Sequence, residues 1–599
     1  MATRNTIKKK WRLSAKIPDT SRQQLRKYSA LVAQLLFNRG FKNPAEAEIF
    51  FNPDYRLLKS PFILSGMVGA VNRLAQAIVA GEKITIYADY DADAVTACSV
   101  LYRGLGVIGA KTINYYIPDR FSEGYGVNGN AIEEIAKNGT KLIVTVDCGI
   151  NSIEEVKRAN QLGVDVIITD HHHITDGLPE ACAVVNHHRD KIPELSGLTG
   201  VGTAFKLLQA LLFSLFPEKY EEQNWEWPKD LDKKMLQSVR ENLNGDVWPH
   251  WEKWVLDLVA IGTIADCQSV MGENRTLVKF GLAVLQKTRW IGLRQLLVSA
   301  GLNNGRQLDT FSIGFVIAPR INAASRIQHA DIAFKLLTTN DLDEAGILSG
   351  QLESLNQHRQ RLTEQIFSEA RAQVELQSGN KALVAVGDGW PKGVIGLVAS
   401  RLSEEFHRPV VVLERSGELA SGSARSIENF NLVDALKASA SSLTRYGGHA
   451  GAAGLTLKHI NLPMFQKQLL GFAENKLQPE DLVRHVAVEA LVEPSDLSLE
   501  VVETLQQFEP FGPGNVQPKF LLEDITVESV REVGNTGKHL RLQASKAGVV
   551  FSLIGFGYGP RKAQLAPGLK IDAVIEASVN VWNGRRDVQR KLMDFRVKV

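Results

Sequence analysis

The chain has 599 residues, more than one hydrophobic core usually serves, so we expect about three or four domains. Hydrophobic residues make up 44% of it and charged residues 23%, values that are ordinary for a globular protein and exclude extensive disorder. The four cysteines lie far apart without a Cys-x-x-Cys pair, which excludes a disulfide framework and a thiolate zinc site.

Charge is unevenly distributed along the chain. The net charge is only +3, but residues 531–599 contain 13 Lys or Arg and 5 Asp or Glu. This basic end favours contact with a polyanion, although a surface that only keeps the protein in solution would have the same composition. The basic residues at the N-terminus are not followed by an apolar segment, and no run of 18 apolar residues occurs. We therefore expect a cytoplasmic protein without a membrane anchor.

The first half of the chain alternates predicted strands and helices. Residues 1–64 have a helical pattern that prolines interrupt. Beyond them, strands are expected at residues 84–88, 113–117, 142–146, 164–169 and 183–185, and helices at residues 96–105, 130–137 and 153–162. This alternation predicts an α/β fold with a mostly parallel sheet over residues 65–341.

The second half predicts three further segments. Residues 342–378 have the pattern of one long polar helix, which we expect to connect two lobes. A second α/β lobe is expected over residues 379–478, beginning with a strand at residues 382–386. Short alternating segments in residues 479–599 predict a small β-barrel or sandwich.

Four apolar segments that we expect to be strands are each followed by an aspartate. These residues are Asp89, Asp147, Asp170 and Asp266, the last after residues 256–265. Ligands of open α/β sheets bind beyond the carboxyl ends of the strands, so these side chains are expected to converge. The alternative is that the four acids follow their strands by chance and form no common site.

The first of these positions carries three carboxylates in five residues, Asp89, Asp91 and Asp93. Such crowding is costly unless a divalent cation offsets it. A calcium-binding EF-hand loop begins with the same spacing. However, Ala94 stands where that loop requires Gly, Val100 stands where it requires Glu, and a strand precedes instead of a helix. We therefore favour a different kind of metal site.

Three histidines, His171, His172 and His173, directly follow Asp170. They suit a metal site, although a surface loop or an accidental metal-binding tract has the same composition. Mixed Asp and His ligands without Cys favour Mn²⁺ or Mg²⁺ over structural zinc. In a two-metal site one aspartate bridges the ions, and Asp147 is our candidate.

These motifs resemble the DHH phosphoesterase superfamily. The segments that carry the resemblance are Asp89-x-Asp91-x-Asp93, Asp147, Asp170-His171-His172 and Gly262-Thr-Ile-Ala-Asp266. Further motifs narrow it to the RecJ family of single-strand-specific exonucleases, namely Ala318-Pro-Arg-Ile-Asn-Ala323, Gly393-Val-Ile-Gly396, Gly422-Ser-Ala-Arg-Ser426 and Gly447-Gly-His-Ala-Gly-Ala-Ala-Gly454. The resemblance runs from about residue 60 to the C-terminus. It implies a DHH lobe, a DHHA1 lobe and a C-terminal OB-fold barrel.

The resemblance also implies roles for residues of the first lobe. The implied metal ligands are Asp89, Asp91, Asp93, Asp147, His171 and Asp266. His172 would lie near the second ion or the scissile phosphate, and Asp170 would orient a ligating imidazole. His173 lies beyond the motif. The candidates for substrate contact in this lobe are Arg320, Asn322 and Arg326.

In the DHHA1 lobe, the resemblance implies a phosphate site. Its candidates are Ser423, Arg425, Gly448 and His449, of which His449 is also a catalytic candidate. Arg425 would hold a phosphate, such as the 5′-terminal one, through its guanidinium fork. Glycine N–H groups around His449 would cradle phosphate, although the residues alone are equally compatible with a tight turn. In the barrel, Arg585 and Arg586 are expected in a hairpin turn and are candidates for phosphate contact.

The chain departs from the family pattern at three places. Family members usually have Gly at the positions of Ala94 and Ser325, and a His where Pro391 follows Trp390. If the backbone at residue 94 needs a positive φ, Ala would cost about 1 kcal/mol and shift Asp93. Lys392 is the candidate to replace the contact of the missing His.

The resemblance implies a 5′→3′ exonuclease specific for single-stranded DNA, which uses two Mn²⁺ or Mg²⁺ ions and releases 5′-mononucleotides in DNA repair and recombination. It also implies a monomer that works beside a single-strand-binding protein and a helicase. A DHH phosphodiesterase acting on cyclic dinucleotides or very short oligonucleotides is the enzymatic alternative, but it would not need a basic β-domain. A non-catalytic DNA-binding scaffold is the other alternative. Such a protein should have lost metal ligands, whereas every Asp and His position of the motifs is filled here.

Overall fold

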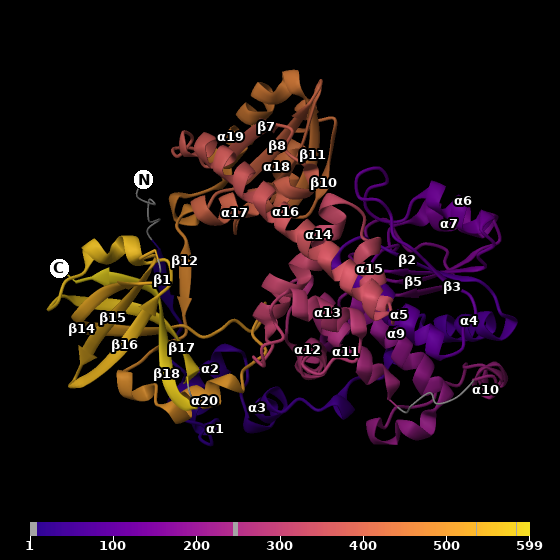
Figure 1. Ribbon diagram of the computed structural model, residues 1–599, viewed down its shortest axis with the longest axis horizontal. Coiled ribbons are helices and arrows are strands. Elements are labelled where there is room, and N and C mark those ends of the chain that lie inside the picture. Colours follow the sequence, from indigo (N-terminus) through magenta and orange to yellow (C-terminus); the bar gives the residue numbers. More distant parts are fainter. Residues whose placement is uncertain (1–8, 244–249, 535, 583, 599) are drawn as a thin grey trace. The chain divides into compact units, whose positions relative to one another are not determined.

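The computed structural model describes residues 9–243, 250–534, 536–582 and 584–598 (Figure 1). The chain divides into two compact units. The first unit comprises residues 53–364 and 512–514, and the second comprises residues 1–52, 365–511 and 515–599. The long helix α16 (Leu342–Glu375) begins in the first unit and ends in the second.

The first unit is built on a five-stranded parallel sheet. The strands lie in the order β3 (Ile113–Tyr116), β2 (Ile84–Ala88), β4 (Leu142–Val146), β5 (Asp165–Thr169) and β6 (Ala183–Val185). All residues of β2 and β4 are buried, as expected for parallel strands covered on both faces. Ala88 pairs with Val146, and Val146 with Thr169. The residues that follow these three strands therefore start at one edge of the sheet.

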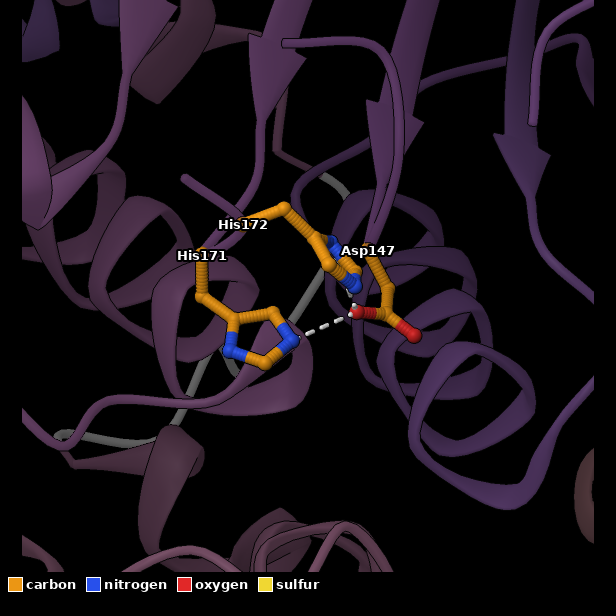
Figure 2. A group of neighbouring side chains, drawn as sticks. All are labelled: Asp147, His171 and His172. Atoms are coloured by element: carbon orange, nitrogen blue, oxygen red, sulfur yellow. Dashed lines mark ion pairs between the residues drawn. The ribbon is translucent and has the colours of Figure 1, made fainter. Parts of the chain in front are cut away.

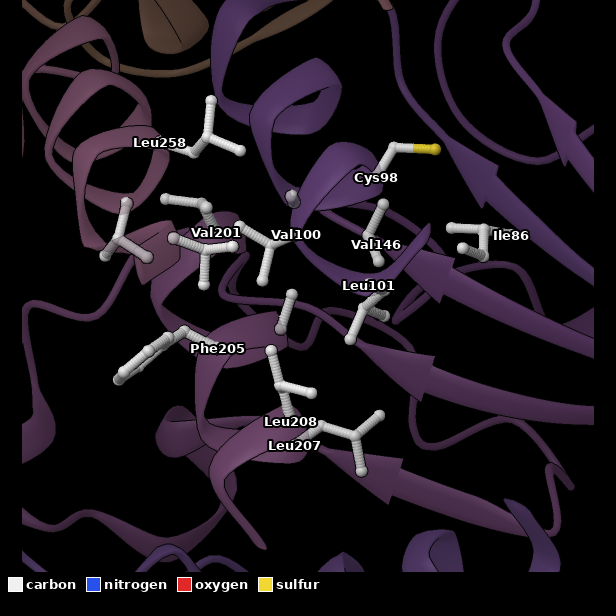
Figure 3. Close-up of a cluster of buried hydrophobic side chains, with 14 of the residues drawn as sticks. Ile86, Cys98, Val100, Leu101, Val146, Val201, Phe205, Leu207, Leu208 and Leu258 are labelled. Atoms are coloured by element: carbon white, nitrogen blue, oxygen red, sulfur yellow. The ribbon is translucent and has the colours of Figure 1, made fainter. Parts of the chain in front are cut away.

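Helices cover both faces of this sheet. The helices of the first unit besides α16 are α4 (Met67–Ala80), α5 (Ala92–Val107), α6 (Gly129–Lys137), α7 (Ile153–Gln161), α8 (His187–Asp190), α9 (Gly200–Leu215), α10 (Lys233–Glu241), α11 (Leu256–Ala265), α12 (Gly272–Leu285), α13 (Ile291–Ser299), α14 (Ala318–Ile327) and α15 (Asp331–Thr338). On one face, Ile86 and Val146 pack with Leu101 of α5 and Phe205 of α9 (Figure 3). On the other face, Ile143 packs with residues of α6 and α7.

The prediction of a strand at residues 256–265 is wrong, because these residues form helix α11 (Leu256–Ala265). Its residues from Leu256 to Thr263 are all buried. A helix that is apolar on every side shows no 3.6-residue period, so its sequence cannot be distinguished from that of a buried strand. Asp266 therefore follows a helix, unlike the other three aspartates.

No single helix in the described residues is long and apolar enough to cross a membrane. One pair of helical segments, Tyr55–Ile63 with Met67–Ala80, reaches that length and composition only in combination, and it is bent by 84°.

The second unit contains a mixed sheet and a barrel. The sheet has the order β10 (Arg445–Gly448), β11 (Ala452–Lys458), β9 (Leu419–Arg425), β8 (Val410–Ser416) and β7 (Leu383–Asp388), with helices α17 (Lys392–Phe406), α18 (Leu432–Ala438) and α19 (Leu462–Lys476). The barrel contains β14 (Phe520–Val533), β15 (His539–Lys546), β16 (Val549–Gly555), β18 (Arg585–Val597) and β17 (Lys570–Trp582). It closes because β17 also pairs with β14. Short strand β13 (Ala490–Leu491) and helix α20 (Leu499–Gln506) precede it.

Two features of the second unit were not expected from the sequence. Strand β14 has a bulge between Leu522 and Ile525, where Asp524 has a φ of +54°. This irregularity interrupts the alternation by which strands are recognised. The N-terminal segment has the expected helices α1 (Asp19–Gln24), α2 (Ala30–Asn38) and α3 (Pro44–Phe51), but also a strand, β1 (Lys10–Leu13), which pairs with β12 (His485–Val488). The predicted fold class, two α/β lobes with a long helix and a C-terminal barrel, is confirmed. The domain boundaries given above stay a prediction.

Candidate active site

Three buried aspartates follow three neighbouring strands at one edge of the parallel sheet. Asp89 follows β2, Asp147 follows β4 and Asp170 follows β5. None of them is more than 3% exposed. Asp147 has a φ of +60°, a left-handed conformation that Asp and Asn adopt more readily than most residues. The backbone is therefore strained at this position, as it often is at functional sites.

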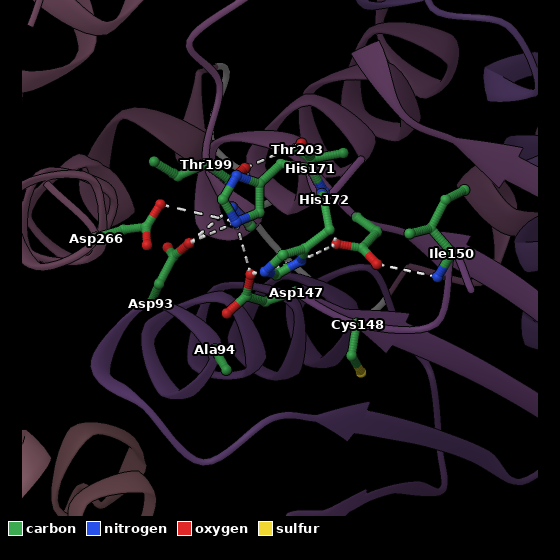
Figure 4. Close-up of polar contacts among 12 residues, drawn as sticks. Asp93, Ala94, Asp147, Cys148, Ile150, His171, His172, Thr199, Thr203 and Asp266 are labelled. Carbon is green, nitrogen blue, oxygen red and sulfur yellow. Dashed lines mark hydrogen bonds and ion pairs between the residues drawn. The ribbon is translucent and has the colours of Figure 1, made fainter. Parts of the chain in front are cut away.

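The imidazole of His171 lies among three carboxylates. Its Nε2 is 3.0 Å from Asp147 Oδ1, 3.7 Å from Asp266 Oδ2 and 4.0 Å from Asp93 Oδ2 (Figures 2 and 4). Burial, with the neighbouring His172, lowers the pKa of His171 to about 3. The imidazole is therefore neutral at pH 7, and a neutral imidazole nitrogen is a good metal ligand.

The carboxylates of this site suit a cation. Asp89 Oδ1, Asp147 Oδ1 and Asp266 Oδ2 are buried and have no hydrogen-bond partner among the described residues. Burial and repulsion by neighbouring carboxylates raise the pKa of Asp147 well above its ordinary value, and that of Asp266 to about 7. One ligand atom each from Asp93, His171 and Asp266 lies within 4.8 Å of the other two, which is close enough for the three to share an ion. The residues present therefore fit a Mn²⁺ or Mg²⁺ ion.

Backbone N–H groups of two helices position the aspartates. Asp93 Oδ2 accepts from Gly200 N at 2.7 Å and Oδ1 accepts from Val201 N at 2.9 Å, at the start of α9. Asp91 Oδ1 accepts from the N–H groups of Asp93 and Ala94 and caps α5. Each carboxylate oxygen has two lone pairs, so these bonds leave acceptor capacity for a metal ion.

Asp170 binds His172 and takes no part in the carboxylate group around His171. Its Oδ1 is 2.7 Å from His172 Nδ1 and accepts from the backbone N–H of His171, while its Oδ2 accepts from Ile150 N. Burial alone would lower the pKa of His172, but the Asp170 hydrogen bond and charge raise it to about 9. His172 is therefore a cation at pH 7, with Nε2 3.0 Å from the Tyr125 hydroxyl. Asp170 thus orients His172, not His171.

Comparison with known proteins identifies the family. Residues 83–239 match the DHH family N-terminal domain, residues 379–475 the DHHA1 domain and residues 488–594 the RecJ OB domain. The chain is 37% identical to the single-stranded-DNA-specific exonuclease RecJ of Bacillus subtilis, over 95% of this chain and 68% of that protein. It is 31% identical to the Escherichia coli protein of the same name, over 88% of this chain and 89% of that protein. This chain belongs to the RecJ family.

Solved RecJ structures agree with the fold and with the metal. The structure of Thermus thermophilus RecJ in complex with Mn²⁺ matches with a TM-score of 0.79 and 32% identity, and covers 98% of this chain and 79% of that one. The Mg²⁺ complex matches with a TM-score of 0.74 and 31% identity, over 98% and 78%. The prediction of Mn²⁺ or Mg²⁺ is confirmed, since side chains of this site, such as Asp93, His171 and Asp266, can hold an ion.

The departures from the RecJ pattern fit the structure without strain. Ala94 is buried inside α5, in a helical conformation, so the positive φ that would strain it does not occur. Ser325 is buried in α14 and places its hydroxyl 3.4 Å from the carbonyl of Asn322. Pro391 precedes α17 with a φ of −59°, and Lys392 is exposed. The strain that would have shifted Asp93 is therefore absent at Ala94.

The substrate candidates of the first unit have different surroundings. Asn322 Oδ1 accepts from the N–H of Ala92 at 2.8 Å, which places it beside the Asp89 to Asp93 segment. Arg320 is ion-paired with Glu353 of α16 at 2.7 Å. Arg326 lies within electrostatic range of the Tyr90 hydroxyl, next to the same segment. Asn322 and Arg326 thus lie near the metal site, whereas Arg320 is held by α16.

The DHHA1 candidates form two small groups in the second unit. Arg425 donates to Ser423 Oγ at 2.7 Å, and a side chain at Gly396 of α17 would come within 3.2 Å of both. Gly448 has a φ of +143°, and the N–H of His449 donates to Ala452 O at 2.8 Å. The segment around His449 is thus an exposed tight turn between β10 and β11.

The expected position of Arg585 and Arg586 in a hairpin turn is wrong. Both are the first residues of β18, and Arg585 pairs with Trp582 of β17. Arg586 forms an ion pair with Glu503 at 2.8 Å. The basic pair therefore lies at the start of a strand.

Sequence reasoning missed two contributions to the site. Tyr125 contacts His172 from a glycine-flanked loop beyond β3, and its position after a strand was the available signal. Gly200 starts α9, and a Cβ there would lie 2.4 Å from the Cβ of Asp147. The segment Thr199-Gly-Val-Gly202 has the pattern of a capped helix start, but nothing in it indicates which carboxylate it meets.

The buried acids make the stability of the metal-free protein depend on pH. Asp266 has a folded pKa of about 7, raised by burial, against an ordinary value of about 3.9, so its stabilising protonation is lost as pH rises through 7. The pKa of His172 is raised to about 9, so the stability that its protonation provides is also lost as pH rises. We expect the melting temperature in EDTA to fall between pH 5 and pH 9, with the Asp266 part lost by about pH 7 and the His172 part lost between about pH 6.5 and pH 9. Excess Mn²⁺ should remove the part of this decrease that the buried aspartates cause. A melting temperature in EDTA that rises over this range would contradict the raised pKa values of Asp266 and His172.

Proposed function

We propose that this chain hydrolyses single-stranded DNA from its 5′ end, uses two Mn²⁺ or Mg²⁺ ions and releases 5′-mononucleotides in DNA repair and recombination. The observation that carries this proposal is the convergence of Asp93, Asp147 and Asp266 on His171, within 4.0 Å of its Nε2. The names of the similar proteins support the substrate, since they are single-stranded-DNA-specific exonucleases. The 5′→3′ direction comes from the family resemblance.

The residues that would hold the ions are Asp89, Asp91, Asp93, Asp147, His171 and Asp266, and Asp147 is the candidate that both ions would share. When bound, the ions lower the pKa of the attacking water and stabilise the charge that develops on the phosphate oxygens. Asp93 is fixed by two backbone N–H groups of α9, so its carboxylate needs no rearrangement to bind. Preorganised ligands of this kind reduce the cost of reaching the reactive geometry.

His172 supplies a positive charge beside the proposed metal ions. Its Nδ1 proton is held by Asp170 at 2.7 Å, which leaves the Nε2 proton for an acceptor. We propose that a phosphoryl oxygen takes the place of the Tyr125 hydroxyl at Nε2. A cation aimed at developing negative charge stabilises the transition state more than the ground state.

We propose that the second unit binds the rest of the substrate. Arg425 and Ser423 would hold the 5′-terminal phosphate, and the exposed tight turn around Gly448 and His449 would approach another phosphate. Arg585 and Arg586 of the barrel would contact phosphates further along the strand. By family resemblance, the chain would act as a cytoplasmic monomer beside a single-strand-binding protein and a helicase.

Four substrates distinguish this function from its alternatives. Purified protein with Mn²⁺ should degrade a long 5′-phosphorylated single strand, leave a blunt duplex of the same sequence intact and degrade a dinucleotide more slowly. Preference for the dinucleotide or a cyclic dinucleotide would favour a short-oligonucleotide phosphodiesterase. Tight binding of the single strand without degradation would favour a non-catalytic scaffold. Equal cleavage of the blunt duplex and the single strand would overturn the proposed specificity.

A further inference from the structure

Two exposed phenylalanine rings stack on each other at the surface of the first unit. Phe311 and Phe315 are 56% and 72% exposed, and their ring centroids are 4.7 Å apart at an interplanar angle of 22°. They are four residues apart on one helical segment and therefore share a face. Exposing two adjacent rings forgoes the stabilisation that their burial would provide, so a stacked pair of this kind marks a binding surface.

The helical segment that carries the rings has unusual geometry. Residues 312–317 form a π-helix (η7, Ser312–Ile317), which begins where Asp309 Oδ1 accepts from Ser312 N at 2.8 Å. Single π-helical turns occur frequently at functional sites. Ile313 and Ile317 of the same segment are completely buried, so it is anchored in the core while Phe315 stays outside. The rings thus sit on a rigid support.

The same segment connects the rings to the metal site. Gly314 lies against Ile264 of α11, two residues before Asp266, since a Cβ at Gly314 would be 3.6 Å from Ile264 Cγ2. The segment continues directly into α14, where Asn322 binds the N–H of Ala92 beside Asp91. Phe315 and Asn322 are seven residues apart, about 10 Å along a helix axis. That length corresponds to roughly three steps of 3.4 Å between stacked nucleotides.

We propose that Phe311 and Phe315 form a stacking platform for bases of the substrate strand, about three nucleotides to the 3′ side of the scissile phosphate. The proposal rests on the proposed function, because it takes single-stranded DNA as the substrate. Every base has a π-face, so aromatic stacking binds a strand without reading its sequence. A dinucleotide cannot reach from the metal site to the platform, so the platform would also favour longer strands.

Equilibrium binding tests the platform separately from catalysis. The probe is a fluorescently labelled, 5′-phosphorylated 20-nucleotide single strand, titrated in EDTA with the wild type, F311A/F315A, F311L/F315L and Ile347→Ala. Ile347 is the matched control, since it is an apolar residue of α16 that is 64% exposed. Both double variants should bind about 5- to 100-fold more weakly than wild type, because leucine keeps the apolar volume but has no π-face. Ile347→Ala should bind like the wild type, and all four proteins should melt at similar temperatures.

A series of strands with one abasic site locates the bases that stack. Wild type should lose affinity most when the abasic site lies near the third to fifth nucleotide from the 5′ end, and F311A/F315A should lose this position dependence. Wild-type affinity in F311L/F315L, unchanged affinity in F311A/F315A or an identical abasic profile would each overturn the platform. Digestion of the intact strand by the wild type in Mn²⁺ reports on the proposed function by itself. If the wild type binds the strand through the platform but does not digest it, the proposed function is contradicted and the platform is not. If the wild type digests the strand and F311A/F315A binds it as tightly as the wild type, the platform is contradicted and the proposed function is not.

Discussion

Asp147→Asn should abolish metal-dependent nuclease activity and at the same time raise the melting temperature of the metal-free protein. Loss of a metal ligand removes several kcal/mol of transition-state stabilisation, which corresponds to a decrease in kcat of about 1,000-fold or more. The carboxylate is buried, and burial with the nearby carboxylates raises its pKa, so its ionised form destabilises the folded protein without metal. Asparagine removes this charge and tolerates the positive φ of the position.

Asp170→Asn is the matched control for this prediction. Asp170 is equally buried, but its hydrogen bonds to His172 and to backbone N–H groups hold its pKa below the ordinary value. Its ionised form therefore stabilises the fold, and Asp170→Asn should lower the melting temperature in EDTA. Thermal melts of both variants with and without Mn²⁺ measure these opposite shifts of the melting temperature. A metal-free Asp147→Asn protein that melts below wild type would contradict the assignment of Asp147 to a group of mutually repelling buried carboxylates.

Gly200→Ala should decrease activity by about 100-fold or more, although residue 200 has no side chain of its own. A Cβ there would lie 2.4 Å from Asp147 Cβ and 2.6 Å from its Oδ1, so either Asp147 or the start of α9 must move. Movement of α9 would also displace Asp93, which binds the N–H of Gly200. A misplacement of about 1 Å costs on the order of 10²-fold in rate. Overpacking should also lower the unfolding free energy by about 1–3 kcal/mol.

Gly202→Ala provides the comparison for Gly200→Ala on the same helical turn. A Cβ at residue 202 would meet Leu198 Cδ2 at 3.1 Å, the end of a flexible side chain, and no carboxylate of the site. We expect Gly202→Ala to keep most of the activity, because neither Asp93 nor Asp147 needs to move. The measurement is kcat on a single strand in Mn²⁺, with a Mn²⁺ titration for each variant. Equal activities of the two variants would show that the close approach of α9 to Asp147 is not required.

Sequence patterns predicted most of the site because parallel strands align their carboxyl ends. Once β2, β4 and β5 are recognised as neighbours, Asp89, Asp147 and Asp170 must begin at one edge of the sheet. Asp266 was also expected there, but it arrives from helix α11. A segment that is buried on all sides has no periodicity, so its sequence fixes its burial and not its secondary structure.

Other features of the site depend on contacts between distant segments. The role of Asp170 follows from its hydrogen bonds to His172 and Ile150, and the spacing of the motif is equally compatible with a metal ligand. The N–H groups of Gly200 and Val201 reach Asp93 across more than 100 positions of the chain. The conformation of Ala94 depends on the N-terminal geometry of α5, which starts at Ala92, before the position that the apolar pattern indicated. Tertiary packing decides these points.

We expect the carboxylates around His171 to support metal-dependent removal of nucleotides from a 5′ end. The most direct test follows two 5′-phosphorylated single strands, one labelled at the 5′ end and one at the 3′ end, during digestion by the wild-type protein. With Mn²⁺, we expect the 5′ label to appear at once as a 5′-mononucleotide while the 3′ label stays on a shortening strand, and we expect no release in EDTA. Release in EDTA, or release of the 3′ label first, would contradict the account.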